Sequence, residues 1–163
     1  FNNRYGETFA EVQPMLTTSA RVMSLKDPMK KMSKSLGGDH CLFLDDAPEE
    51  VERKMKSAVT ATTGGDGIAP GVQTLFALLE AFGDAGEVAR FRAAHDDGSI
   101  KYSELKPAVA RACSTYFADF RTKKAELLAQ SEKVDGILAA GATKARAVAA
   151  ETLAKIREKV GMR

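Results

Sequence analysis

The chain has 163 residues, of which 44% are hydrophobic and 28% are charged, and its formal net charge at pH 7 is only +2. This composition is that of a globular protein and excludes an intrinsically disordered chain. No apolar run approaches the ~20 residues of a transmembrane helix, so we expect no membrane span.

The cysteines and the distribution of charge narrow the class of protein further. Cys41 and Cys113 lie far apart, which excludes both a disulfide framework and a Cys-x-x-Cys metal site and suits the reducing cytoplasm. Residues 101–163 hold thirteen basic and seven acidic side chains. That excess fits either a phosphate-facing surface or an ordinary solvated helical face. Because the chain begins with Phe1 rather than methionine, we expect a fragment or a processed chain.

The first 45 residues contain two candidate strands and a polar loop between them. An apolar run at residues 20–25 predicts a buried or edge strand, and the Asp-Pro pair at 27–28 predicts the turn that follows it. Residues 31–39 form a polar loop. The short stretch 40–44 is a second candidate strand.

From residue 46 onward, the apolar residues follow the helical period of about 3.6. Asp46 and Glu49 have the spacing of a capping pair, with Pro48 in the first turn of the helix that they open. A Gly-rich loop follows at residues 60–69. Further helices are predicted over residues 70–82, 87–93, about 103–129 (the longest) and about 142–160, where Gly161 provides the stop.

The polar loop and the lysine just before it form the one dense cluster of chemically useful side chains. Lys30, Lys31 and Lys34 fall within five residues and alternate with Ser33 and Ser35. A lysine ammonium can follow a polyphosphate whose charge moves during a reaction, and hydroxyl and loop N–H groups add hydrogen bonds to its oxygens. A reaction that releases pyrophosphate needs such groups, because charge builds on the leaving phosphates. From composition alone, a solvated lysine-rich loop is the alternative.

The order of the residues in this loop points to a family. Lys31-Met-Ser-Lys-Ser35 is identical to the KMSKS signature of class I aminoacyl-tRNA synthetases, and we call residues 31–39 the signature loop. From residue 1 to residue 163, the chain resembles one branch of that class, the bacterial-type tryptophanyl-tRNA synthetases. The segments that carry this resemblance are Phe1-Asn-Asn-Arg-Tyr-Gly-Glu-Thr-Phe9, Arg21-Val-Met-Ser-Leu-Lys-Asp-Pro28, Asp45-Asp46, Lys56-Ser-Ala-Val-Thr60, Pro70-Gly-Val72, Lys101-Tyr102 and Gly141-Ala-Thr-Lys-Ala-Arg146.

The resemblance implies a mainly α fold, in which a C-terminal helical bundle follows the last strand and the KMSKS loop of a Rossmann-like catalytic domain. Residues 1–45 are then the C-terminal edge of that catalytic domain, and residues 46–163 are a helical domain that faces tRNA. The implied reaction activates tryptophan with ATP to tryptophanyl-adenylate and pyrophosphate, and then transfers it to tRNA. The paired-histidine signature of the catalytic domain is absent from the chain, so we expect the fragment alone to be inactive.

The resemblance also assigns roles by position. Lys31 and Lys34 are the implied catalytic residues, which hold the β- and γ-phosphates as pyrophosphate departs. The backbone at Val22 and Met23 is implied to lie beside adenine. The full set of implied nucleotide-binding residues is Val22, Met23, Lys31, Met32, Ser33, Lys34 and Ser35.

The implied partners are tRNA, tryptophan, ATP with its Mg²⁺, and the missing N-terminal catalytic domain. The full-length enzyme is expected to be a cytoplasmic homodimer, and no residue of the chain is expected to bind a metal. The resemblance assigns no contact with the anticodon. The candidates for that contact, by charge alone, are Lys123, Lys124, Lys144 and Arg146.

Three alternatives stay open at this point. A fragment of a tyrosyl-tRNA synthetase is the nearest, because that enzyme shares the fold and the loop. A non-catalytic RNA-binding helical module derived from such an enzyme is the second. A plain helical interaction domain with an accidental lysine loop is the third.

Overall fold

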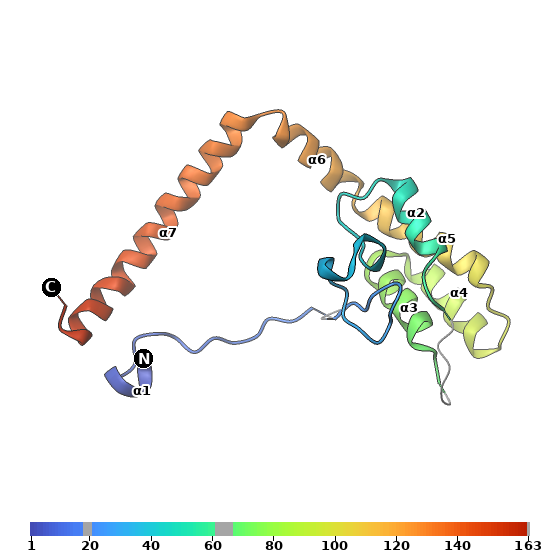
Figure 1. Ribbon diagram of the computed structural model, residues 1–163, viewed down its shortest axis with the longest axis horizontal. Coiled ribbons are helices and arrows are strands. Elements are labelled where there is room, and N and C mark those ends of the chain that lie inside the picture. The colour runs from blue at the N-terminus through green and yellow to red at the C-terminus, as the bar shows by residue number, and fades with distance from the viewer. Residues whose placement is uncertain (18–20, 61–66, 163) are drawn as a thin grey trace. The chain divides into compact units, whose positions relative to one another are not determined.

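The structure is a computed structural model that describes residues 1–17, 21–60 and 67–162 (Figure 1). The first residue of the predicted strand at 20–25 and residues 61–66 of the predicted Gly-rich loop lie outside the described residues. In the part of the chain that is described, no helix is long and apolar enough to cross a membrane.

Two compact units make up the chain. One is formed by Leu16–Thr122, and the other by Phe1–Met15 together with Lys123–Arg163. The first unit contains the signature loop. The predicted domain boundary between residues 45 and 46 stays a prediction, because contacts within this chain alone define these units.

The core of the Leu16–Thr122 unit is built around α5 (Tyr102–Tyr116). Both α2 (Pro48–Lys56) and α3 (Pro70–Phe82) pack against α5, and α4 (Ala85–Asp96) packs against α3 (Figure 1). The predicted mainly α fold is confirmed. The largest apolar side chains of this core are Leu25, Val51, Met55, Val72, Leu75, Phe76, Leu78, Leu79, Phe91, Leu105 and Val109.

The ends of α3 and α4 follow from local sequence. Pro70 lies in the first turn of α3, where its missing N–H costs no hydrogen bond, and Gly83 ends the helix as predicted. Asp84 then caps α4, because its Oδ1 accepts a 2.8 Å hydrogen bond from the Gly86 amide. This cap starts α4 slightly before the predicted start at Glu87.

A glycine in the first turn of α3 lets that helix approach the backbone that follows α2. A Cβ atom on Gly71 would collide with the Val59 carbonyl and would lie 3.1 Å from the Thr60 Cα atom. The Val59 amide in turn donates a 2.8 Å hydrogen bond to the Leu25 carbonyl. The close approach therefore links α3 to the segment that precedes the signature loop.

The predicted cap of α2 is wrong. Ala47 occupies the N-cap position, and none of the described side chains caps the helix. Asp46 has other partners: its Oδ2 accepts hydrogen bonds from the Phe43 amide at 2.9 Å and from Lys54 Nζ at 2.6 Å. A buried ammonium competes more strongly for this carboxylate than an exposed helix N-terminus does.

The predicted single helix that would span α5 and α6 (Ala118–Leu128) is broken at Phe117. This residue has φ −94° and ψ 11°, and its ring packs against that of Phe82 with 5.1 Å between centroids. The Arg121 guanidinium donates a 2.6 Å hydrogen bond to the Ser114 carbonyl, so a side chain supplies the donor that a continuing helix would supply from its backbone. Side-chain contacts therefore explain a break that the apolar spacing does not reveal.

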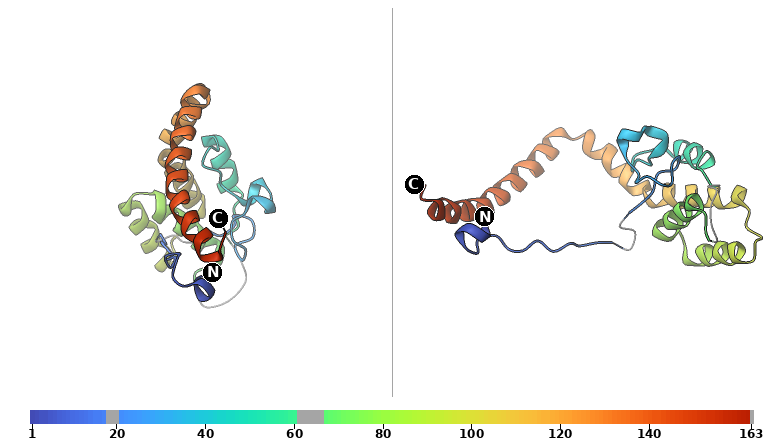
Figure 2. Two further views of the ribbon diagram at one scale, coloured as in Figure 1. Left: turned by 90° about the vertical axis from the view of Figure 1, so that its left-hand side faces the viewer. Right: turned by 60° about the horizontal axis from the view of Figure 1, so that its bottom comes forward.

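The last helix, α7 (Ser131–Val160), begins earlier than the predicted start at residue 142 (Figure 2). Alanine has the highest helix propensity, and the alanine-rich centre of α7 lets the helix run through Gly136 and Gly141 without a break. Its end is as predicted: Gly161 has φ 75° and stops the helix in the left-handed conformation.

The second unit joins α7 to the start of the chain. Lys159 Nζ donates hydrogen bonds to the carbonyls of Gly6 at 3.3 Å and Glu7 at 2.8 Å, just after α1 (Asn2–Tyr5). None of the described residues of α7 is buried, and Val148 on its predicted apolar stripe is 70% exposed. The helices α2 to α5 therefore form the buried core of the bundle.

Both predicted strands are wrong, since the described residues contain no strand. The segment 20–25 instead contributes an isolated antiparallel bridge between Met23 and Lys31, because the chain turns back after residue 28 and the ladder stops after one pair. The second segment starts inside a 3₁₀ turn, η2 (Gly38–His40). Apolar side chains such as Leu25 pack against the helices rather than across a sheet.

Candidate functional site

The signature loop begins at the isolated antiparallel bridge between Met23 and Lys31. Met23 and Lys31 lie opposite each other as a non-hydrogen-bonded antiparallel pair. On one side of the pair, the Met32 amide donates a 3.0 Å hydrogen bond to the Val22 carbonyl. On the other side, the Ser24 amide donates a 2.9 Å hydrogen bond to the Lys30 carbonyl. The N–H and C=O groups of a residue in such a pair point away from the partner strand. None of the hydrogen bonds between described residues uses the N–H or C=O group of Met23, so these groups can meet an external hydrogen-bonding group.

Lys30 is neutralised within the turn that precedes the loop. Its Nζ lies 3.0 Å from Asp27 Oδ2, and its amide donates to the Asp27 carbonyl at 2.9 Å. The hydrogen bond from Lys30 lowers the pKa of the Asp27 carboxyl, and the Met29 amide lowers it further. This exposed pair adds little stability. Because Asp27 neutralises Lys30, the lysines of the cluster that have no nearby carboxylate among the described residues are Lys31 and Lys34.

Lys31 and Lys34 are exposed, and neither forms a salt bridge with a residue that the structure describes. Lys34 starts a 3₁₀ turn, η1 (Lys34–Leu36). The hydroxyls of Ser33 and Ser35 lie 2.8 Å apart beside it. The structure thus brings two ammonium groups and two hydroxyls, all predicted from the sequence, into one short segment that can present them to an anion.

Met32 anchors the loop to the helical core. Its side chain is half-buried and, like that of Val22, packs against the core. The two side chains line an apolar cavity of about 180 Å³ that residues 42–44 and the helices α2, α3 and α5 also line. Burial commits these two side chains to packing, and the hydrogen bond between the Met32 amide and the Val22 carbonyl holds their backbone together.

The far end of the loop is tied to α2. Arg53 Nη2 lies 2.6 Å from Asp39 Oδ1 and 2.7 Å from Glu50 Oε1. The hydrogen bonds from Arg53 lower the pKa values of Asp39 and Glu50, and these carboxylates raise the pKa of Arg53. Sequence analysis missed Arg53, because no local pattern indicates a partner fourteen residues away.

Lys54, the next residue, holds the segment that follows the loop. Its side chain is 2% exposed, and its Nζ lies 2.6 Å from Asp46 Oδ2 and 3.1 Å from the Cys41 carbonyl oxygen. The same ammonium lies 4.6 Å from the centroid of the Phe43 ring. Sequence analysis missed this residue too. The available signal was a lysine three residues after Val51, on the apolar side of the predicted helix.

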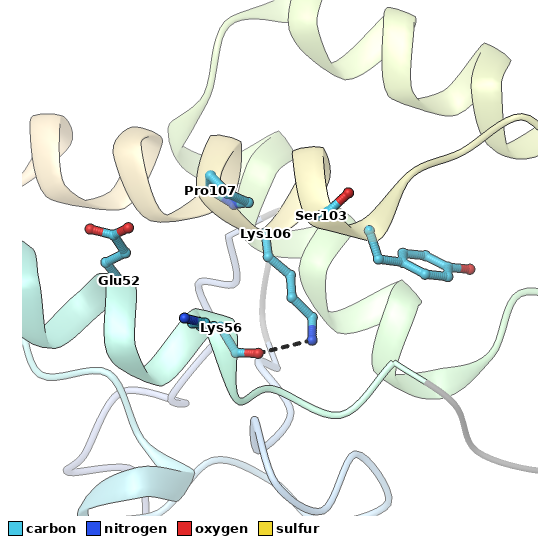
Figure 3. Close-up of a pocket in the computed structure, with 6 residues that line it drawn as sticks. Glu52, Lys56, Ser103, Lys106 and Pro107 are labelled. Atoms are coloured by element: carbon cyan, nitrogen blue, oxygen red, sulfur yellow. Dashed lines mark hydrogen bonds between the residues drawn. The ribbon is translucent and has the colours of Figure 1, made fainter.

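A second concave site lies between α2 and α5 (Figure 3). Its volume is about 380 Å³, and Lys106 Nζ inside it donates a 3.1 Å hydrogen bond to the Lys56 carbonyl. Burial lowers the pKa of Lys106, and the nearby charge of Lys26 lowers it further. Lys26 Nζ donates to the Ser57 carbonyl at 3.1 Å. Both lysines therefore satisfy carbonyls at the C-terminal end of α2.

The basic residues singled out by charge lie on α6 and α7. Lys123 Nζ is 3.1 Å from Glu126 Oε2, while Lys144 and Arg146 are exposed. Their contact with RNA stays a prediction, as does that of Lys124.

Comparison with known proteins places the chain in a family. The family model described as "tRNA synthetases class I (W and Y)" matches residues 1–118. The chain is 36% identical over 170 residues to tryptophan–tRNA ligase 2 of Streptomyces avermitilis and 32% identical over 166 residues to tryptophan–tRNA ligase of Treponema pallidum. Each alignment covers 99% of this chain, but only 49% and 48% of those proteins.

Solved structures give the same result. Tryptophanyl-tRNA synthetase from Campylobacter jejuni, crystallised with ADP and tryptophan, has a TM-score of 0.69 and 28% identity. That alignment covers 99% of this chain and 50% of the Campylobacter chain, so the present chain spans about half the length of its relatives. The family match includes the whole base of the signature loop and both exposed lysines, and the chain belongs to the class I tRNA synthetases of the tryptophan and tyrosine group.

Proposed function

We propose that the chain is the part of a tryptophan–tRNA ligase that carries the KMSKS loop and the helices that follow it. The observation that carries this proposal is the pair of unbalanced ammonium groups, Lys31 and Lys34, on a loop whose two ends are held by hydrogen bonds and an ion pair. The curated relatives are tryptophan–tRNA ligases, which favours tryptophan over tyrosine as the amino acid. The whole enzyme activates tryptophan with ATP and then esterifies tRNA.

In the first step, a carboxylate oxygen of tryptophan attacks the α-phosphorus of ATP and the bond to the β-phosphate bridging oxygen breaks. Negative charge accumulates on the departing pyrophosphate. Lys31 and Lys34 stabilise that charge, and the hydroxyls of Ser33 and Ser35 add hydrogen bonds. Both ammonium groups also meet the triphosphate of bound ATP, and the part of their interaction that strengthens as charge develops raises the rate of the step.

The adenine end of ATP is proposed to lie against the base of the loop. The outward-facing N–H and C=O groups of Met23 suit the donors and acceptors at the edge of a purine. Val22 and Met32 support this edge by packing beneath it. In the described residues no group of three His, Cys, Asp or Glu side chains is placed to hold a metal ion. We expect Mg²⁺ to enter as the ATP complex, bound by phosphate oxygens, and assign it no ligand in this chain.

The remaining partners are proposals of the same kind. The whole protein is expected to contain the other half of the catalytic domain, to form a homodimer and to act in the cytoplasm. The helices from Pro48 onward are expected to face tRNA.

The test is ATP–pyrophosphate exchange by the full-length protein. Exchange is expected with tryptophan and not with tyrosine, followed by charging of tRNA. Exchange with tyrosine instead would favour the tyrosyl enzyme. Binding of tRNA without exchange of either amino acid would favour a non-catalytic RNA-binding module and overturn the proposal.

A further inference from the structure

His40 joins the two ends of the signature loop. The side chain of Ser24 is fully buried, and its Oγ lies 2.9 Å from His40 Nδ1. The Leu25 amide also donates to the His40 carbonyl, at 3.2 Å. Because Ser24 and Leu25 precede the loop and His40 follows it, these two bonds close the loop at its base.

The other partners of Ser24 fix the direction of its bond with His40. Ser24 Oγ accepts hydrogen bonds from the amides of Lys26 at 3.3 Å and Asp27 at 3.2 Å. A hydroxyl has two acceptor lone pairs and one hydrogen. With both lone pairs occupied, Ser24 donates its hydrogen to Nδ1, which acts as the acceptor of this bond. Position 40 therefore requires a side-chain acceptor at the site of Nδ1.

The hydrogen bond between Ser24 and His40 holds the loop more firmly than the ion pair between Asp39 and Arg53 does. The ion pair between Asp39 and Arg53 has side chains about half exposed, 50% and 53%, and such pairs contribute little. The bond between Ser24 and His40 ends on a fully buried oxygen that also orders two amides of the preceding turn. Loss of that bond leaves a buried hydroxyl without its acceptor and frees the turn and the loop together.

We propose that His40 is a positioning residue for Lys31 and Lys34, a role that rests on the function proposed above. In this role it acts through the loop and not by contact with ATP or tryptophan. By closing the base, it keeps the loop within the small set of conformations in which both ammonium groups can meet one polyphosphate. Without the bond from His40, ATP binding has to order the loop as well. The apparent affinity for ATP is then the intrinsic affinity multiplied by the fraction of molecules whose loop is in a binding-competent conformation.

The test uses the full-length protein and tryptophan-dependent ATP–pyrophosphate exchange. His40→Leu is expected to raise KM for ATP about tenfold while KM for tryptophan stays within about twofold. His40→Asn keeps an acceptor oxygen near the site of Nδ1 and should bring KM for ATP back to within about threefold of the unmodified protein. Ser24→Ala should raise KM for ATP at least as much as His40→Leu, because it also removes the acceptor of the Lys26 and Asp27 amides. The double variant should be no worse than Ser24→Ala alone.

His95→Leu is the matched control, because the chain has two histidines and the ring of His95 packs against Phe76 at 5.8 Å, in the helical core. It should leave KM for ATP unchanged. A merely structural role for His40 would reduce the amount of folded enzyme, and so kcat, without raising KM for ATP.

A second readout does not depend on ligase activity. Without substrates, trypsin should cut His40→Leu after Lys31 and Lys34 about tenfold faster than the unmodified protein, as measured by mass spectrometry of the fragments, because cleavage follows the population of open loop. Unchanged KM for ATP together with unchanged cleavage would overturn the proposed role of His40. If the unmodified protein shows no exchange, the proposed ligase function fails, and the cleavage rates still decide whether His40 holds the loop.

Discussion

Replacing Asp46 by asparagine is expected to lower the free energy of unfolding by about 3 kcal/mol. Removing one partner of a buried ion pair costs about 3–5 kcal/mol, because the remaining charge stays in the protein interior without compensation. After the change, Lys54 keeps the Cys41 carbonyl at 3.1 Å and the Phe43 ring at 4.6 Å. Glu50 Oε1, at 3.7 Å, offers partial compensation and places the expected loss at the lower end of the range.

The assay is urea unfolding followed by far-ultraviolet circular dichroism. With a slope of about 2 kcal/mol per molar urea, a loss of about 3 kcal/mol lowers the midpoint by about 1.5 M. The double variant Asp46→Leu with Lys54→Met removes both charges, and its free energy of unfolding is expected to lie within about 2 kcal/mol of that of the unmodified protein. This difference includes the loss of the hydrogen bond from the Phe43 amide. A loss below about 1 kcal/mol for Asp46→Asn would refute the argument, because it would mean that the ammonium of Lys54 reaches water.

Three further predictions concern catalysis and pH. Lys34→Ala in the full-length protein should lower kcat for ATP–pyrophosphate exchange by about 30- to 1,000-fold, which is about 2–4 kcal/mol by analogy with removal of an oxyanion donor; a change within threefold would show that the residue does not stabilise the leaving group. The 163-residue chain by itself should show no exchange above background, since the other half of the nucleotide site is needed to position the reactants, and exchange near that of a full-length relative would contradict this. Burial raises the pKa of the Cys113 thiol from 9.0 to about 12. The folded state therefore keeps a proton that the unfolded state loses, and stability should fall between about pH 9 and 12, by at most ~1.4 kcal/mol per pH unit. The fall from pH 9 to pH 10 should be smaller in Cys113→Ala, and an equal fall in both proteins would contradict the assignment.

Features coded by neighbouring residues could be predicted from the sequence. Pro70 and Gly83 mark the two ends of α3, and Gly161 marks the end of α7, because each acts on the backbone next to it. The signature residues could be found for a similar reason: Lys31 and Lys34 belong to one continuous string.

Features that depend on distant partners could not be predicted. The break at Phe117 depends on Phe82, which lies far away in the sequence, and on a side chain that reaches back to a helix carbonyl. The apolar run at 20–25 had strand character, but a strand needs a neighbour, and the described residues supply only the single bridge at Met23. Arg53 and His40 were missed for the same reason, since their carboxylate and hydroxyl partners lie fourteen and sixteen positions away.

The conformation of the signature loop also depends on Gly71, a residue of α3 that has no reactive group. A methyl group at that position would push α3 off the backbone at Val59, whose amide holds the Leu25 carbonyl just before the loop. A working loop therefore also depends on a helix residue more than thirty positions from the lysines. A search for essential residues guided by chemical reactivity would pass over it. A screen of random substitutions should instead find position 71 less tolerant than exposed lysines such as Lys144.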